Sequence, residues 1–135
     1  MLVADGNSTT ASLTRTLARV TLGRGASYVS VESGSEAVVA SHLNRPDLVI
    51  SEFRLRGSDG VETLRKIRER LGSDIPAVFT VQKIEHDYVK RRLPGRSAIV
   101  VRPFDRSTLE AALRSLFGTE LAAETGAPRS PGDEQ

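Results

Sequence analysis

The fold of this chain is decided by the stretch Asp47-Leu48-Val49-Ile50-Ser51-Glu52-Phe53-Arg54-Leu55-Arg56-Gly57-Ser58-Asp59-Gly60. Its residues 48–50 form a continuous apolar run with two β-branched side chains, which is typical of a parallel strand covered on both faces. Glu52 stands at the carboxyl end of this strand, and a glycine-containing turn follows it. In open α/β sheets, ligands bind outside the carboxyl ends of the strands. Glu52 is therefore the first candidate site residue.

Strands and helices alternate on both sides of this stretch. Before it we expect strands at 2–4 and 28–31, a helix that begins at Asn7 or Ser8, and a second helix that begins at a Ser-x-x-Glu capping box and ends near Leu43. After it we expect helices at 59–71, 85–93 and 105–117, with strands at 75–81 and 98–101 between them. Apolar residues at helical spacing mark one face of three helices: Leu13, Leu17 and Val20; Val61, Leu64, Ile67 and Leu71; and Leu109, Leu113, Leu116 and Phe117.

This alternation of five strands and five helices predicts an α/β fold. The expected architecture is a five-stranded parallel sheet, doubly wound and flavodoxin-like, with strand order 2-1-3-4-5. Its switch point lies between the first and third strands, which places Asp5 beside Glu52. We expect the domain to occupy residues 1–118. Residues 119–135, rich in Ala, Gly, Pro, Ser and charge, are predicted to be a flexible tail or linker.

The composition excludes several classes of function. A length of 135 residues suits one domain, and the absence of cysteine excludes disulfides, thiolate zinc sites and thiol catalysis. No apolar run of about 18 residues and no leader pattern occur, so we expect a cytoplasmic protein with no membrane contact. The basic residues are mostly arginines interspersed with acids and without aromatic neighbours, so we expect no direct binding of nucleic acid.

Six short segments carry a resemblance to a known family. In chain order they are Leu2-Val3-Ala4-Asp5, Glu32-Ser33-Gly34-Ser35-Glu36-Ala37, Pro46-Asp47-Leu48-Val49-Ile50, Gly57-Ser58-Asp59-Gly60, Asp74-Ile75-Pro76 and Arg102-Pro103-Phe104-Asp105. Together they resemble the landmarks of the receiver domain of bacterial two-component response regulators. The resemblance covers residues 1–118 at family spacing, so it implies the receiver fold and a role in signal transduction.

The resemblance also implies positions for a phosphorylation site. A working receiver accepts a phosphoryl group on an Asp at the end of its third strand and holds Mg²⁺ with an acidic pair after its first strand. A Thr or Ser after the fourth strand and a Lys before Pro-Phe bind the phosphoryl oxygens, and an aromatic residue on the fifth strand often reports the switch. The matching positions here are Glu52 for the acceptor, Asp5 and Gly6 for the acidic pair, Val81 for the hydroxyl, Arg102 for the lysine and Ile99 for the aromatic residue.

These changes predict a site that has lost its chemistry. Mg²⁺ prefers carboxylate and water ligands, but Gly6 removes one carboxylate and Arg54 adds a positive charge two residues after Glu52. The extra methylene of a glutamate also moves its carboxylate out of in-line geometry. We therefore expect weak or absent Mg²⁺ binding, no cofactor, no enzymatic activity and no conventional phosphorylation. The chain is interpreted as an atypical receiver that acts through protein contacts.

The state of the changed site allows more than one interpretation. In the favoured one, Asp5 and Glu52 are held in ion pairs by Arg102 and Arg54. In a second, Glu52 mimics the phosphorylated carboxylate and the receiver is constitutively active. Against the mimic, the side chain at position 81 is a valine, which has no hydroxyl to donate.

Thr80 does not replace the missing hydroxyl in these interpretations, because alternation along a strand should turn it to the other face of the sheet. Further alternatives are an acid and base pair formed by Asp5 and Glu52, an unusual phosphoacceptor, and an anion-binding regulator of a separate output domain.

A basic surface is expected on the side of the fourth and fifth helices. It comprises Lys90, Arg91, Arg92, Arg96, Arg106 and Arg114. In the family that this chain resembles, this side is the common surface for dimerisation and for contact with an output domain. We therefore expect a protein partner or output domain, or a homodimer formed through the fourth helix, fifth strand and fifth helix.

Overall fold

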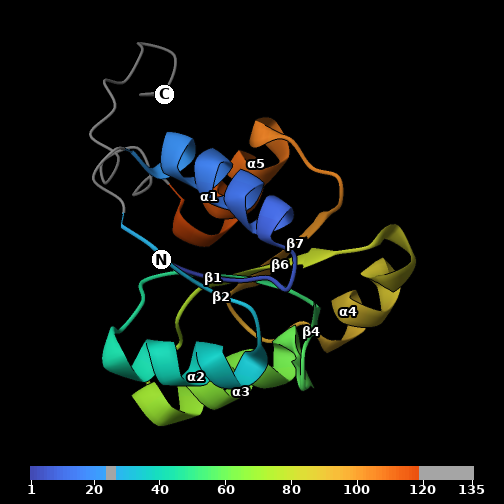
Figure 1. Ribbon diagram of the computed structural model, residues 1–135. Coiled ribbons are helices and arrows are strands. Elements are labelled where there is room, and N and C mark those ends of the chain that lie inside the picture. The colour runs from blue at the N-terminus through green and yellow to red at the C-terminus, as the bar shows by residue number, and fades with distance from the viewer. Residues whose placement is uncertain (24–26, 119–135) are drawn as a thin grey trace.

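A parallel sheet forms the centre of the structure, a computed structural model that describes residues 1–23 and 27–118. Helices cover both faces of this sheet (Figure 1). The strands of the sheet are β1 (Leu2–Ala4), β2 (Val29–Val31), β3 (Val49–Glu52), β6 (Ala77–Val81) and β7 (Ser97–Val101). The helices are α1 (Ser8–Leu22), α2 (Gly34–Leu43), α3 (Gly60–Leu71), α4 (His86–Arg92) and α5 (Arg106–Phe117).

The strand order confirms the predicted topology. The sheet runs β2-β1-β3-β6-β7 with every neighbouring pair parallel, so its strands, counted among themselves, follow the order 2-1-3-4-5. In the register of the sheet, Ala4 lies opposite Ser51, and Thr80 lies between Glu52 and Val100. This register brings the carboxyl ends of β1, β3, β6 and β7 to one edge, where the candidate site lies.

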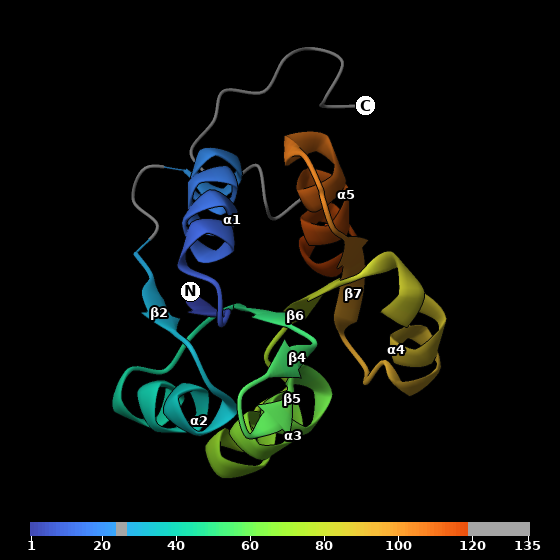
Figure 2. The same ribbon diagram turned by 45° about the vertical axis from the view of Figure 1, so that its right-hand side comes forward.

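Two apolar cores fill the space between the sheet and its helices. On one face, α1 and α5 pack on Ile50, Val78 and Val100; on the other, α2, α3 and α4 surround Phe79 and Val81. Figures 1 and 2 show α1 and α5 together on one side of the sheet and α2 and α3 on the opposite side. The predicted stripes of α3 and α5 face these cores, because Leu64, Ile67, Leu109 and Leu113 are all buried.

The predicted stripe of α1 faces the core only in part, because Leu17 packs against it and the other two members do not. Leu13 and Val20 are 49% and 53% exposed, whereas Ala11, Thr14 and Ala18 are buried. Small side chains let the helix axis lie close to the sheet and to α5, and this closeness selects the face. Leucine spacing therefore indicated the helix correctly but its buried side only in part.

The segment between β3 and α3 contains a hairpin that the sequence did not predict. Strands β4 (Arg54–Leu55) and β5 (Ser58–Asp59) pair antiparallel, with Gly57 in the left-handed region at φ 81° between them. Gly60 then begins α3 so close to β3 that a Cβ there would come within 2.6 Å of the Glu52 carbonyl oxygen. The hairpin and α3 are therefore fixed tightly against the end of β3.

The ends of the other elements agree with the sequence to within a few residues. The side chains of Asn7, Ser33, Asp59 and Asp105, each just before a helix, accept a hydrogen bond from the backbone N–H three residues later. A 3-10 turn, η1 (Lys83–Glu85), precedes α4. The predicted tail at 119–135 lies outside the described residues. Within the described ranges, no helix is both long enough and apolar enough to cross a bilayer.

Candidate functional site

Four side chains meet where the sheet strands end. Asp5 follows β1, Glu52 ends β3, Thr80 lies one residue before the end of β6, and Arg102 follows β7. Arg102 continues the ladder beyond β7, because its N–H donates to the Val81 carbonyl at 2.8 Å. The structure thus brings together the predicted acceptor, acidic and lysine positions, as the switch point required.

The guanidinium of Arg102 lies at the centre of this cluster. Its Nη2 pairs with Asp5 Oδ2, and its Nη1 lies 3.4 Å from Glu52 Oε2. Its Nε and Nη2 also donate to the Thr80 hydroxyl at 3.1 and 2.9 Å. Asp5 is only 3% exposed, so it has lost its water and depends on this cation for charge balance.

Glu52 and Gly6 fit one another. The Gly6 N–H donates to Glu52 Oε1 at 2.6 Å. A Cβ at position 6 would lie 3.2 Å from that same oxygen, which is a tight contact. The Glu52 side chain, one methylene longer than an aspartate, therefore occupies space that is open because residue 6 has no side chain.

Both carboxylate oxygens of Asp5 are engaged within the chain. Oδ1 accepts from the Asn7 N–H at 2.8 Å, and Oδ2 accepts from Arg102. The described part of the chain contains no group of three or more His, Asp or Glu residues placed to hold a metal ion. The guanidinium of Arg102 thus lies between the carboxylates of Asp5 and Glu52.

The environment of Glu52 favours its neutral form. Burial raises the pKa of Glu52 above its usual 4.5, and the nearby charges of Asp5 and Glu85 raise the pKa further. The Gly6 N–H and the Arg102 guanidinium oppose this shift without cancelling it. Arg102 is therefore paired more closely with Asp5 than with Glu52.

Thr80 is a member of the cluster that the sequence did not predict. It does point to the face opposite Val81, as alternation requires, and no bulge interrupts β6 between Ala77 and Val81. The opposite face, however, is the one on which Glu52 lies, because the two residues are paired in register. Glu52 and Thr80 point to the same face of the sheet because they are paired on neighbouring strands. The sequence could predict this contact only if the strand register were known.

Val81, at the hydroxyl position, is buried in the core on the other face with Phe79 and Val89. Ile99, at the aromatic position, is half-buried and packs against the same core. Neither side chain contributes a polar group to the cluster around Arg102.

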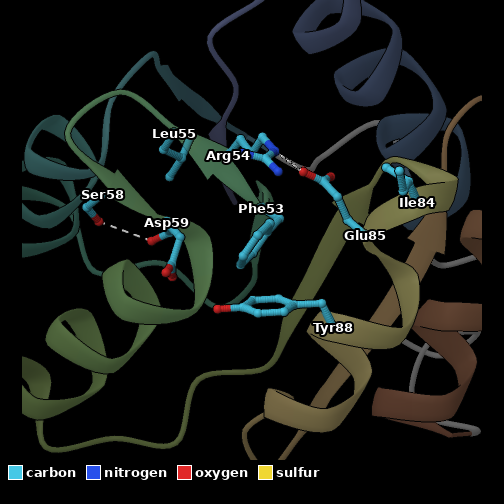
Figure 3. Close-up of a pocket in the computed structure, with 8 residues that line it drawn as sticks. All are labelled: Phe53, Arg54, Leu55, Ser58, Asp59, Ile84, Glu85 and Tyr88. Atoms are coloured by element: carbon cyan, nitrogen blue, oxygen red, sulfur yellow. Dashed lines mark hydrogen bonds and ion pairs between the residues drawn. The ribbon is translucent and has the colours of Figure 1, made fainter.

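The prediction that Arg54 helps to hold Asp5 and Glu52 in ion pairs is wrong. Its side chain is 77% exposed and pairs with Glu85 of η1 instead of Asp5 or Glu52 (Figure 3). Arg54 lies on β4 of the hairpin, which turns it toward the start of α4. Glu85 is buried, and its other oxygen accepts the Gln82 N–H at 2.9 Å. The Gln-x-x-Glu spacing was the sequence signal for this cap.

The predicted basic surface is partly used within the chain. The Arg92 guanidinium stacks 3.5 Å above the Tyr88 ring, and both Arg106 and Arg114 pair with Glu110 on α5. The remaining members, Lys90, Arg91 and Arg96, have no acidic partner within 4.0 Å among the described residues. Lys90 and Arg91 are adjacent and exposed on α4.

Comparison with known proteins decides the family. The family model for the response regulator receiver domain matches residues 1–114. This chain belongs to the response regulator receiver domain family. Its receiver domain is 30% identical over 116 residues to the DNA-binding response regulator MtrA of Mycobacterium tuberculosis H37Rv, and 28% identical over 94 residues to the transcriptional regulatory protein CseB of Streptomyces avermitilis. These matches cover 85% and 69% of this chain, but only 49% and 39% of the two relatives.

Solved receiver domains have the same fold. Vibrio cholerae CheY4 matches with a TM-score of 0.68 at 18% identity, covering 85% of this chain and 95% of that one. The receiver domain of the Pseudomonas aeruginosa sensor histidine kinase PA1611, solved with a magnesium ion in its active site cleft, matches with a TM-score of 0.70 at 20% identity, covering 85% and 93%. At these identities the likeness establishes the receiver fold alone.

Proposed function

We propose that this receiver domain signals through protein contacts without accepting a phosphoryl group. The observation that carries the proposal is the position of the Arg102 guanidinium, which pairs with Asp5 and lies 3.4 Å from Glu52. Its positive charge lies between the carboxylates that stand at the positions of the family's acidic pair and acceptor. The chain thereby retains the scaffold of a signalling module while its site is closed by internal ion pairs.

Phosphoryl transfer depends on cations that neutralise the phosphoryl oxygens while the nucleophile is held in line. A Mg²⁺ ion would have to displace Arg102 from Asp5, leaving a buried guanidinium without its partner. Gly6 offers no replacement carboxylate. The electrostatic cost of loading the metal therefore opposes the first step of the reaction.

Glu52 is also a poor nucleophile in this setting. One of its oxygens accepts the Gly6 N–H, and the other faces Arg102. Burial raises the pKa of Glu52, so the site disfavours the charged carboxylate that would attack. The same features disfavour the phosphate-mimic alternative, because Val81 supplies no hydroxyl and Thr80 already accepts from Arg102.

We propose that the output of this receiver comes from a protein partner or a separate domain. The chain spans about half the length of the curated relatives it matches, and those relatives bear the names of a DNA-binding regulator and a transcriptional regulator. The contact surface that we propose is formed by α4, β7 and α5, and it includes Lys90 and Arg91, which are exposed and have no acidic partner within 4.0 Å among the described residues. A contact of this kind works without chemistry at Glu52.

A phosphodonor experiment tests the absence of phosphorylation. The wild-type chain is incubated with Mg²⁺ and acetyl phosphate, and its intact mass is measured under conditions that preserve acyl phosphates. We expect no phosphoryl adduct. The variant Gly6→Asp/Glu52→Asp/Val81→Thr/Arg102→Lys, which restores the family's residues, is expected to gain one. An adduct on the wild type that disappears in Glu52→Gln would show that Glu52 is a working acceptor.

A further inference from the structure

A hollow of about 550 Å³ lies beside the site, between the β4–β5 hairpin and the η1–α4 segment (Figure 3). Its apolar lining comes from Phe53 and Leu55 on one side and from Ile84 and Tyr88 on the other. Pockets for small molecules commonly measure about 300–1,000 Å³ and combine an apolar lining with a few polar groups. This hollow has a volume in that range and a mixed apolar and polar lining, and it is open to solvent at Ile84 and Tyr88.

The two aromatic rings that line the hollow, Phe53 and Tyr88, are held in place by neighbouring side chains. The Phe53 ring is buried, and its centroid lies 5.6 Å from that of Tyr88 at an interplanar angle of 58°. Arg92 covers one face of the Tyr88 ring, and its Nη1 also donates to the Tyr88 carbonyl at 3.1 Å. Tyr88 therefore needs little reordering to receive a ligand, which lowers the entropic cost of binding.

The charged side chains that line the hollow sum to one negative charge, which belongs to Asp59, an exposed residue that caps α3. Arg54 and Glu85 neutralise each other. Asp59 accepts the Glu62 N–H at 2.7 Å through Oδ1, and no lysine, arginine or histidine nitrogen among the described residues lies within 4.0 Å of its carboxylate. Figure 3 shows Asp59 across the hollow from the Arg54–Glu85 pair. A ligand that brings a positive charge to Asp59 would complete the electrostatic balance.

We propose that this hollow binds a small molecule that joins a flat aromatic ring to a protonated amine. The ring would lie against Phe53, Leu55 and Tyr88, and the ammonium group would pair with Asp59. Such a ligand would contact both the segment that follows β3 and the start of α4. The inference goes beyond the proposed function and does not depend on whether Glu52 accepts a phosphoryl group, since none of the pocket's contacts involve Asp5 or Arg102.

Amide NMR of the full chain with two matched probes tests this inference. Tryptamine and indole-3-propionate share an aromatic ring and differ in the sign of their charge. We expect saturable tryptamine shifts centred on Phe53, Arg54, Asp59 and Tyr88, and an affinity about two- to fivefold higher for tryptamine, the range of one partly exposed charge pair. The absence of saturable shifts at these residues with millimolar tryptamine would overturn the proposal.

Three variants separate the pocket from general charge effects. Asp59→Asn keeps a good N-cap for α3 and removes the charge, so the advantage of tryptamine should disappear while the ring still binds. Asp87→Asn removes an exposed charge on α4 outside the hollow and should keep the advantage. Tyr88→Ala should weaken both probes. An advantage that survives in Asp59→Asn, or is lost equally in Asp87→Asn, would contradict the assigned site.

Discussion

At the scale of single residues, Arg102 determines the character of the site. Its guanidinium pairs with the carboxylate of Asp5, which is almost fully buried. A planar guanidinium donates in several directions at once, so it reaches Asp5, Glu52 and Thr80 together, whereas the ammonium of a lysine is a point charge. An arginine in place of the family's lysine therefore changes both the arrangement of the side chains in the site and the groups that the cation contacts.

Arg102→Met is expected to destabilise the fold by about 3 kcal/mol, because it leaves the Asp5 carboxylate buried without a partner. Arg65→Met is the matched control, since Arg65 pairs with Glu62 and Glu69 on the exposed side of α3 and should matter little. Urea unfolding followed by circular dichroism measures both. Equal losses in the two variants would mean that Arg102 is not a buried structural partner.

The pH dependence of stability reports on Glu52. Because the folded-state pKa of Glu52 is raised above 4.5, the folded chain binds this proton more tightly than the unfolded chain does. The resulting stability is complete below the unfolded pKa and is lost as the pH rises through the folded pKa. Glu52→Gln should not show this loss.

We therefore expect wild type to lose stability relative to Glu52→Gln between about pH 4 and about pH 8, measured by urea unfolding at both values. Glu69→Gln, an exposed substitution of the same kind on α3, is the control and should follow wild type. A wild type that gains stability relative to Glu52→Gln as the pH rises would show that Arg102 stabilises the charged form more than burial opposes it.

The residue identities of the site were readable from the sequence, but their contacts were not. The positions of Asp5, Glu52 and Arg102 at strand ends follow from the alternation of elements, and the structure brings them together as expected. The contact of Thr80 required the strand register, and the turn of Arg54 toward Glu85 required the unpredicted hairpin. Both depend on pairing between segments far apart in the chain.

At the scale of elements, α4 divides its basic residues between two roles. Arg92 supports the Tyr88 ring beside the hollow, whereas Lys90 and Arg91 extend from the same helix into solvent. Reversal of Arg92 would therefore disturb packing as well as charge. The surface proposed for partner contact is best tested through Lys90 and Arg91.

In the homodimer expected from the sequence, Lys90→Glu/Arg91→Glu should reduce self-association, because it reverses the exposed charge of the proposed contact surface. Light scattering over a range of concentrations measures the average mass. Arg65→Glu/Lys66→Glu makes the same change of charge on α3, away from that surface, and should leave the mass unchanged. An average mass that is the same in wild type and in the α4 variant would exclude Lys90 and Arg91 from a dimer contact.

The positions of the elements were predicted more accurately than their orientations. Capping residues and apolar runs located the five strands of the sheet and the five helices to within a few residues, because these signals are local. The buried face of α1 was predicted only in part, because Leu17 packs against the core, whereas Leu13 and Val20 are exposed and Ala11 and Ala18 are buried instead. Apolar residues at helical spacing predict that a helix forms, whereas tertiary packing determines which of its faces is buried.

At the scale of the whole molecule, we propose that this chain keeps the receiver fold without the receiver chemistry. The sheet order and the two apolar cores depend on buried residues that this chain retains. The phosphorylation chemistry depends on a few polar residues at one edge of the sheet, and those are the ones that differ. This chain can therefore keep its fold, and with it the proposed contact surface, while ion pairs between Asp5, Glu52 and Arg102 occupy the carboxyl ends of the strands.

An amide NMR titration with Mg²⁺, followed by beryllofluoride, tests the closed site most directly. Beryllofluoride binds a receiver's acceptor carboxylate as a phosphoryl mimic when Mg²⁺ is present. We expect no saturable shifts at Asp5, Gly6, Glu52 or Arg102 with millimolar Mg²⁺, and none after beryllofluoride is added. Saturable shifts centred on these residues that grow with beryllofluoride would contradict the closed site and establish a receiver that still accepts phosphoryl groups.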